Sequence, residues 1–294
     1  LAALHHHVGN PWEHMMCPGY FTLPGNDHRY RDWWPQGHGP VNLSDSIAQS
    51  CDVYFYALAL ELGIDRMHDF LAQFGFGDTT GIDIQGEKSG LLPSREWKRR
   101  ALQEAWFPGE TIITGIGQGF MLATPLQLAH ATATVAARGQ RFAPSLVSAV
   151  RDPVTGEITP RKPRPLDPVE TIDADNWKHI VTAMDEVVNG LRGTARAIGI
   201  DAPMRIAGKT GTAQVFTVAQ DDDYDADEVD ELLRDHALFV GFAPVELPRV
   251  AIAVLVENGG SGSSAAAPVA RAVLDEWHRQ ERLLAAGDSR EAAR

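Results

Sequence analysis

A polar tetrapeptide, Lys-Thr-Gly-Thr at residues 209–212, interrupts a segment that otherwise consists of strand-forming residues. The whole segment, residues 205–216, reads Arg-Ile-Ala-Gly-Lys-Thr-Gly-Thr-Ala-Gln-Val-Phe. A strand normally alternates apolar and polar side chains, whereas this one groups a cation, two hydroxyls and two glycines. Gly208 and Gly211 would let a ligand lie against the backbone. We therefore predict a strand with one ligand-facing side. Because short motifs recur by chance, an ordinary turn or edge strand is the alternative.

Length and charge limit the classes of protein to which the chain can belong. Its 294 residues are 44% hydrophobic and 22% charged, which is typical of a soluble globular protein with a sizeable core. The net charge of -13 argues against a general nucleic-acid binder, which needs a basic surface. No apolar run reaches membrane-spanning length, and no signal peptide opens the chain. The abrupt start at Leu1 leads us to interpret the chain as a fragment that lacks an upstream part.

The first 43 residues are rich in Pro, Gly, His and Trp, and we expect little regular structure there. Four residues of metal-ligand type lie in or just after this segment: Cys17, Asp32, His38 and Cys51. Thiolate, imidazole and carboxylate in a set of four suit tetrahedral zinc. A Cys17–Cys51 disulfide is an equal alternative on spacing alone, with His38 capping a turn and Asp32 paired with a nearby arginine.

The periodicity of the remaining chain predicts helices and a few late strands. Residues 42–63 indicate a broken helix or helical hairpin that ends at Gly63, and Ser50-Cys51-Asp52 opens its most apolar part. A second N-cap is the structural alternative for Ser50 and Asp52. Further helices are predicted at residues 67–74, 124–139, 175–189 and 265–284, and strands at 236–243 and 250–257. We expect an α/β (α+β) fold with a mostly antiparallel sheet covered by helices.

Three other segments are predicted to be irregular or to lack a binding role. Residues 151–170 carry five prolines and indicate a surface connection. The acidic run at 221–231 indicates a solvated loop. The glycine cluster at 115–119 lacks the preceding strand and the later acidic residue of a dinucleotide-binding fingerprint, which excludes that function.

Three motifs in this order resemble the transpeptidase domain of class B penicillin-binding proteins, and most closely the elongation-type penicillin-binding protein 2. They are Ser50-Cys51-Asp52, Gly115-Ile-Gly-Gln-Gly119 and Lys209-Thr-Gly-Thr212. Shorter matches extend the resemblance over nearly the whole chain: Arg29-Tyr-Arg-Asp-Trp33, Gly37-His-Gly39, Tyr54-Phe-Tyr56, Leu62-Gly-Ile-Asp65 and Arg234-Asp-His236. The resemblance implies a penicillin-binding/serine β-lactamase-like fold with a helical subdomain.

The resemblance also implies a chemistry and roles for individual residues. Such enzymes cross-link peptidoglycan stem peptides through a serine acyl-enzyme, and β-lactams acylate the same serine. Ser50 would relay protons to the leaving group, and Asp52 stands where many relatives have asparagine. Lys209 would supply positive potential. Thr210 and Thr212 would bind the substrate carboxylate, the Thr212 N–H would form half of the oxyanion hole, and Gly211 would leave room for the substrate.

One family motif is missing from the sequence. No serine in this chain is followed three positions later by a lysine, and the family places its Ser-x-x-Lys just before the part that corresponds to Leu1. We therefore expect residues 1–294 to be a transpeptidase domain fragment without its nucleophile and general base. Such a fragment should not form an acyl-enzyme.

The resemblance favours zinc over the disulfide. Relatives are similar in placing Asp32, His38 and the equivalent of Cys51 around a metal, often with aspartate where this chain has Cys17. We expect structural zinc, since four protein ligands leave no open position for water. The metal would staple residues 1–52 to the second catalytic motif through Cys51.

The family implies further partners and a location. Besides stem peptides and β-lactams, these are the glycosyltransferase and scaffold proteins of the elongation complex. The domain would work at the periplasmic face of the bacterial inner membrane, held there by an upstream anchor. Two alternatives are a serine β-lactamase or D,D-carboxypeptidase of the same fold, and a non-catalytic binding or scaffold module.

Overall fold

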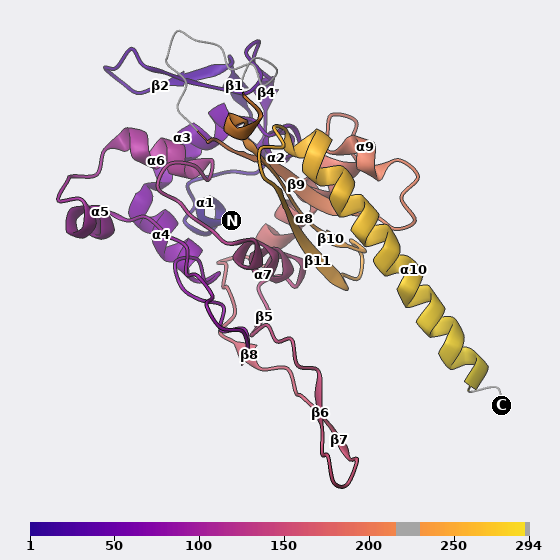
Figure 1. Cartoon of the computed structure of the whole chain (residues 1–294). Coiled ribbons are helices and arrows are strands. Elements are labelled where there is room, and N and C mark those ends of the chain that lie inside the picture. The colour runs from indigo at the N-terminus through magenta and orange to yellow at the C-terminus, as the bar shows by residue number, and fades with distance from the viewer. Residues whose placement is uncertain (216–229, 292–294) are drawn as a thin grey trace. The chain divides into compact units, whose positions relative to one another are not determined.

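The computed structural model describes residues 1–215 and 230–291 (Figure 1). The chain forms two units, each with its own internal packing. Unit 1 comprises Leu1–Asn10 and Tyr56–Trp177, and unit 2 comprises Pro11–Phe55 and Lys178–Arg294. We describe each unit by itself.

The helices and strands have the following bounds. The helices are α1 (Ala2–His5), α2 (Leu43–Gln49), α3 (Asp52–Leu62), α4 (Ile64–Ala72), α5 (Arg95–Ala101), α6 (Pro108–Gly115), α7 (Pro125–Ala136), α8 (Asp175–Asn189), α9 (Arg196–Gly199) and α10 (Ala267–Glu291), with short helical turns at η1 (Glu231–Leu233) and η2 (Gly262–Ala266). The strands are β1 (Met15–Cys17), β2 (Tyr20–Thr22), β3 (Arg29–Arg31), β4 (Gly39–Val41), β5 (Arg141–Phe142), β6 (Ala149–Arg151), β7 (Ile158–Pro160), β8 (Pro165–Leu166), β9 (Ala207–Ala213), β10 (His236–Ala243) and β11 (Val250–Val256).

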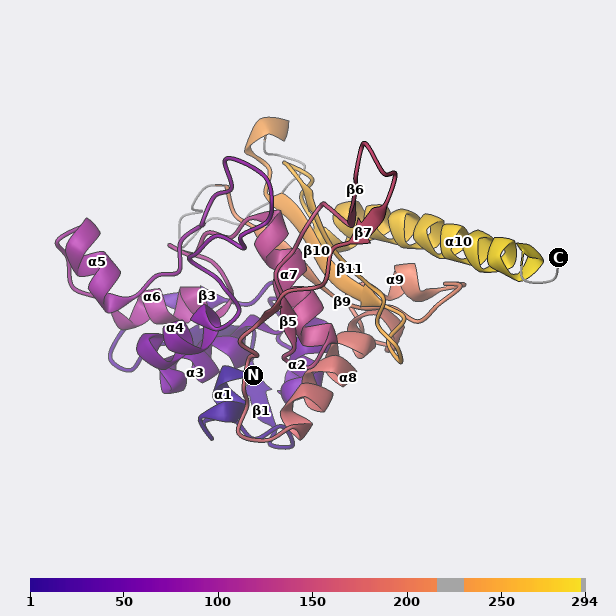
Figure 2. The same cartoon turned by 90° about the horizontal axis from the view of Figure 1, so that it is seen from below.

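The main sheet lies in unit 2 and has the strand order β11-β10-β9, with antiparallel pairing throughout. This confirms the predicted late antiparallel strands. Phe239 and Phe242 of β10 are fully buried and form part of the core. α10 runs along β10 and β11, as Figure 2 shows from below. In the described part of the chain, β9 is the end strand of this sheet, so one of its edges carries no neighbouring strand.

The predicted broken helix is confirmed as α2 followed by α3. Asn42 caps α2, since its side-chain oxygen accepts a hydrogen bond from the Asp45 backbone N–H. The break occurs at Ser50, whose backbone is left-handed with φ 57° and ψ 48°. A non-glycine residue in this region pays a conformational cost of roughly 1–2 kcal/mol. The surrounding contacts must therefore hold Ser50 in place.

The N-terminal stretch has more regular structure than we predicted. Four three-residue strands form two small antiparallel ladders, β1 with β4 and β2 with β3. Residues 1–10 fall in unit 1 and residues 11–55 in unit 2. The segment that we grouped as residues 1–52 is thus divided between the units.

Unit 1 is mainly helical and has an aromatic cluster in its core. Phe70, Phe74 and Trp177 are buried together with Val169. α7 begins at the predicted threonine cap, where Thr124 and Gln127 form a capping box. α5 and α6 were not predicted, although Ser94 caps α5 and a proline opens α6.

The proline-rich segment that we interpreted as a surface connection contains an unpredicted hairpin. β6 and β7 pair within it, and residues 145–165 are all exposed, as a surface segment requires. The predicted acidic loop at 221–231 falls almost entirely outside the described residues. Among the described residues, no helix combines the length and the hydropathy that crossing a bilayer requires.

Candidate functional site

Two motifs that lie far apart in the sequence meet in unit 2. The Lys209 ammonium donates hydrogen bonds of 2.8 Å to the Ser50 hydroxyl oxygen and of 2.8 Å to the Thr210 carbonyl. Burial lowers the pKa of Lys209 to about 8, although the Asp52 carboxylate partly opposes this shift. The lysine is therefore still mostly protonated at pH 7, and it holds the serine hydroxyl from one side.

Contacts with α8 and β10 fix the position of β9. Arg205, just before the strand, makes two 2.7 Å hydrogen bonds to the Asp185 carboxylate of α8. Asn189 Nδ2 donates to the Ile206 carbonyl at 2.8 Å. A side chain at Gly208 would meet the Phe239 ring at 2.4 Å. We predicted that Gly208 makes room for a ligand, but it is buried, and its missing side chain lets β10 pack closely.

The rest of the tetrapeptide lies toward the outer end of β9. Thr210 Oγ1 shares a 2.8 Å hydrogen bond with Thr194 Oγ1. The Thr194 backbone N–H donates to the Ala48 carbonyl of α2 at 3.1 Å, so this threonine connects α2 to β9. Thr212 is exposed and Gly211 is half-buried. A strand edge without a neighbour, with hydroxyls beside it, can pair with an extended peptide.

Trp33 holds the Ser50–Asp52 turn from the other side. Its backbone N–H donates to Asp52 Oδ2 at 3.1 Å, and its indole Nε1–H donates to the Gln49 carbonyl at 3.0 Å. Burial, together with the smaller effect of the nearby Asp32 carboxylate, raises the pKa of Asp52 to about 7. The left-handed Ser50 thus lies between two residues, Gln49 and Asp52, that both accept hydrogen bonds from Trp33.

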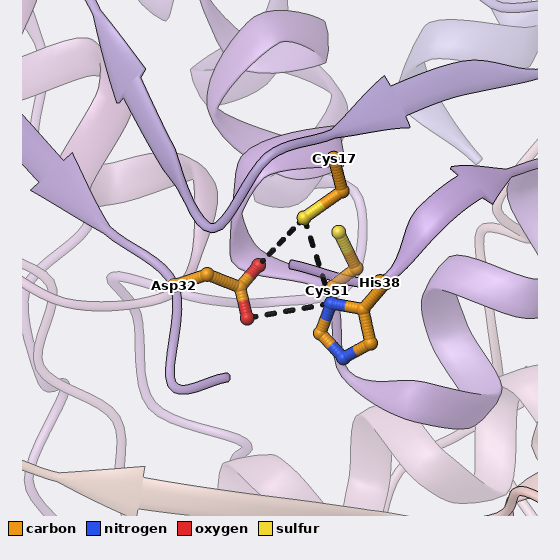
Figure 3. Close-up of side chains that lie close together, drawn as sticks. All are labelled: Cys17, Asp32, His38 and Cys51. Atoms are coloured by element: carbon orange, nitrogen blue, oxygen red, sulfur yellow. Dashed lines mark hydrogen bonds and ion pairs between the residues drawn. The ribbon is translucent and has the colours of Figure 1, made fainter. Parts of the chain in front are cut away.

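The four predicted ligand residues, Cys17, Asp32, His38 and Cys51, lie together next to this turn. Their candidate ligand atoms are all within 4.8 Å of one another, and Figure 3 shows the side chains pointing toward a common centre. Cys17 Sγ is 3.5 Å from Asp32 Oδ2 and 3.6 Å from His38 Nδ1, and His38 Nδ1 is 3.5 Å from Asp32 Oδ1. Tetrahedral zinc ligands at ordinary bond lengths stand about 3.3–3.8 Å apart. The residues present therefore fit a zinc ion.

The surroundings of the cluster also suit a metal. Asp32 is oriented by the backbone N–H groups of Trp34, at 3.0 Å, and Val53, at 3.2 Å. His38 Nε2 is buried and has no hydrogen-bond partner among the described residues. Both cysteines carry free thiols, so the structure contains no Cys17–Cys51 disulfide. Burial raises the pKa of the Cys51 thiol, so only a bound cation would deprotonate it near neutral pH.

Sequence reasoning missed two residues of this site. Trp33 belongs to the Arg29–Trp33 segment that resembles the family but was given no role, and Thr194 had no signal beyond its place in the Gly193-Thr194 pair after α8. Trp33 acts through its backbone and indole N–H groups, and Thr194 acts through its hydroxyl and its backbone N–H. The periodicity of a sequence does not reveal such contacts. The predicted residues Ser50 and Lys209 are in direct contact, whereas Thr212 lies further along the strand.

Comparison with known proteins places this geometry in a family. The family described as "Penicillin binding protein transpeptidase domain" matches residues 1–275. The chain belongs to this family. Its mixture of helices and antiparallel strands is the penicillin-binding protein transpeptidase fold, and relatives with that fold superpose with TM-scores of 0.81 and 0.80.

Individual penicillin-binding proteins are similar to most of the chain. Acinetobacter baumannii peptidoglycan D,D-transpeptidase MrdA is 44% identical over 286 residues, which cover 94% of this chain and 40% of the relative. The structure of Pseudomonas aeruginosa PBP2 in complex with WCK 5153 is 46% identical with a TM-score of 0.81, covering 94% of this chain and 56% of that one. Helicobacter pylori PBP2 in complex with MreC is 31% identical with a TM-score of 0.76, covering 89% and 44%.

The similarity to these penicillin-binding proteins extends over only part of their length. The chain spans about two fifths of the length of the curated relatives it matches, 43% of one and 40% of another.

Proposed function

We propose that this chain is part of the catalytic domain of a peptidoglycan D,D-transpeptidase of the penicillin-binding protein 2 type. The observation that supports this most directly is the 2.8 Å hydrogen bond from Lys209 Nζ to Ser50 Oγ, which joins two of the three family motifs present in the chain. The relatives named above as D,D-transpeptidases favour this function over a β-lactamase, a carboxypeptidase or a non-catalytic scaffold.

The geometry suggests how each residue contributes. Because the Ser50 oxygen accepts a hydrogen bond from Lys209, its own proton is free to move toward a leaving group. Lys209, still protonated at pH 7, would attract the carboxylate of a stem peptide or β-lactam. Thr210 and Thr212 would add hydroxyl donors to that carboxylate. A substrate strand would pair, beside Gly211, with the edge of β9 that has no neighbouring strand among the described residues.

The test is acylation by a fluorescent penicillin. In the complete gene product, we expect Ser50→Ala to slow acylation by roughly 10²-fold, the usual effect of losing a proton-transfer group. Residues 1–294 alone should remain unlabelled, because no serine among them precedes a lysine by three positions. An unchanged rate of acylation in Ser50→Ala would contradict the role proposed for that residue. Labelling of residues 1–294 alone would show that the nucleophile lies within them.

We further infer that Cys17, Asp32, His38 and Cys51 bind structural zinc. The distances between their ligand atoms support the proposal, and a bound zinc ion would supply the positive charge that keeps both thiols deprotonated. Cys51 lies between Ser50 and Asp52, so the cluster would fix the turn that carries the relay serine. Four protein ligands leave no open position, which makes the role structural.

Metal analysis of the purified chain tests this assignment. We expect one zinc per chain, lost in Cys51→Ala and in His38→Ala but retained in His14→Ala, where an exposed histidine is the matched control. Cys17→Asp should also retain zinc, since a carboxylate is an equally suitable ligand. A zinc-free protein with an intact Cys17–Cys51 disulfide would refute the assignment.

The remaining proposals concern partners and location. We propose that the complete protein acts outside the cytoplasm, at the periplasmic face of the inner membrane, on peptidoglycan stem peptides. Glycosyltransferase and scaffold proteins of the elongation complex are its proposed partners. The Helicobacter PBP2 structure with MreC supports the scaffold part of this proposal.

A further inference from the structure

The β6–β7 hairpin of unit 1 has no core of its own. Figure 1 shows it extending beyond the helices of that unit, and every residue from 145 to 165 is exposed. Its aliphatic side chains remain in contact with solvent: Leu146 is 69% exposed, Val150 62%, Val154 91% and Ile158 53%. An isolated two-stranded hairpin is at best marginally stable in water. Contacts at the two ends of the β6–β7 hairpin must therefore stabilise it.

Two carboxylates fix the ends of the hairpin. At the base, Asp83 accepts hydrogen bonds from Ser145 Oγ at 2.8 Å and from the Leu146 N–H at 2.7 Å, and it pairs with Arg161. At the tip, Asp152 Oδ1 accepts from two successive backbone N–H groups, those of residues 154 and 155, at 2.7 and 2.9 Å. The hairpin is thus held in one conformation while its apolar side chains stay uncovered.

The ladder shows which backbone groups point away from the hairpin. The Arg161 N–H donates to the Ser148 carbonyl at 2.8 Å, and the Asp152 N–H donates to the Glu157 carbonyl at 2.9 Å. Hydrogen-bonded pairs alternate with non-bonded pairs in an antiparallel ladder. The pairs 149/160 and 151/158 are therefore non-bonded pairs. Residues 149 and 151 direct their N–H and C=O groups away from β7, to the outer edge of β6.

The two outer edges of the hairpin differ. On β7 the outward positions are Ile158 and Pro160, and prolines follow at 163 and 165. Proline has no N–H, which blocks pairing with a further strand. On β6 the outward positions are Ala149 and Arg151, and no proline occurs from residue 145 to 152. Only the β6 edge is suited to accept another strand.

The charge of the hairpin indicates what kind of partner fits. Residues 145–165 carry four basic and two acidic side chains, whereas the whole chain has a net charge of -13. In the described structure, Arg151, Lys162 and Arg164 form no ion pair with an acidic side chain. A second copy of the chain would bring an equally basic hairpin to the β6 edge and would be repelled. An acidic segment complements this edge.

The distribution of side chains argues against an anionic membrane as the partner. Val150 and Ile158 are on opposite faces of the ladder, because neighbouring cross-strand pairs alternate between faces. A surface that lies flat on lipid needs its apolar side chains on one face. The exposed Val154 at the tip is flanked by Asp152 and Glu157, which anionic headgroups would repel.

We propose that β6 is a docking edge for an extended, proline-free, acidic segment of a partner protein. The segment adds as a third strand beside residues 147–151, with main-chain hydrogen bonds to Ala149 and Arg151. Its acidic side chains lie on the face that carries Arg151, and its apolar side chains cover Val150 on the opposite face. This inference is independent of the catalytic assignment.

The test uses the whole chain and a panel of seven-residue peptides. The peptides alternate glutamate with valine, threonine or tyrosine, and matched peptides have lysine in place of glutamate. Binding is followed by amide NMR and hydrogen exchange. We expect an acidic peptide to slow exchange at the Ala149 and Arg151 amides. The Val150 amide, already paired within the hairpin, should show little further change.

Two proline variants separate edge pairing from other binding. Ala149→Pro removes an outward N–H from β6, and we expect it to weaken peptide binding at least tenfold. Ile158→Pro is the matched change on the opposite edge, and we expect less than a twofold effect. Equal binding by both variants, preference for the lysine peptides or no binding by any acidic peptide would overturn the proposal. Binding only to phosphatidylglycerol vesicles would overturn it in favour of a membrane surface.

Discussion

Two lysines in opposite electrostatic surroundings provide the sharpest test of the site. Lys209 in unit 2 contacts a hydroxyl and a carbonyl, and burial lowers its pKa from 10.5 to about 8. Lys98 in unit 1 contacts the carboxylates of Glu110 and Glu104, which raise its pKa. The charged form is disfavoured by folding at Lys209 and favoured at Lys98. We therefore expect replacement by methionine to act in opposite directions.

The expected size follows from proton linkage. Below pH 8 both folded and unfolded Lys209 are protonated, so the full cost of burying its charge is present. Between pH 8 and 10.5 the unfolded chain binds more protons, so the free energy of unfolding rises with pH. This gain amounts to about 2 kcal/mol between pH 7 and pH 10. Lys209→Met lacks the group and should not show it.

The assay is urea unfolding of the wild type and both methionine variants at pH 7 and pH 10. The difference in free energy of unfolding between wild type and Lys209→Met should change by about 2 kcal/mol, with the wild type gaining at pH 10. Lys98→Met should lower the free energy of unfolding at pH 7. The free energies of unfolding of wild type and Lys209→Met could instead differ by the same amount at pH 7 and pH 10. That result would refute the reasoning that burial lowers the pKa of Lys209.

Three further predictions concern contacts around β9 and the hairpin. Thr194→Val should lower the free energy of unfolding by about 1 kcal/mol, because it removes the hydrogen bond to Thr210, and Thr194→Ser should restore it in urea unfolding. Gly262→Ala should cost about 2–3 kcal/mol in the same assay, since its side chain would come within 2.5 Å of the Gly211 carbonyl oxygen, and a neutral effect would contradict this contact. Asp83→Ala should speed hydrogen exchange at the amides of residues 146 and 147, and unchanged exchange would show that the hairpin base is held by other contacts.

The sequence predicted those parts of the fold that are governed by local signals. β9, β10 and β11 have strong strand character and form the expected antiparallel sheet. The break between α2 and α3 followed from the capping residues and the position of Ser50. In contrast, the β6–β7 hairpin was missed because its prolines resemble those of a simple connection. Proline on the outer edge of a strand is compatible with pairing on the inner edge.

The site was predictable to the extent that its residues occur in recognisable motifs. Lys209 and Ser50 were singled out from their motifs, but their direct contact depends on how α2 lies against β9, which Thr194 connects. Gly208 was assigned to ligand access, whereas the ring of Phe239 occupies the space that its side chain would fill. The role of Trp33 could not be predicted, because it arises from two hydrogen bonds that exist only in the folded chain.

The left-handed backbone at Ser50 restricts which amino acids evolution can place there. Glycine, asparagine and aspartate adopt this conformation readily, but none of them carries a hydroxyl. Threonine carries one, yet its branched Cβ makes a positive φ a genuine outlier. If Ser50 has the relay role proposed above, its hydroxyl therefore has no equivalent substitute under selection by a drug that binds beside it. Escape mutations should accumulate at neighbouring positions and leave position 50 unchanged.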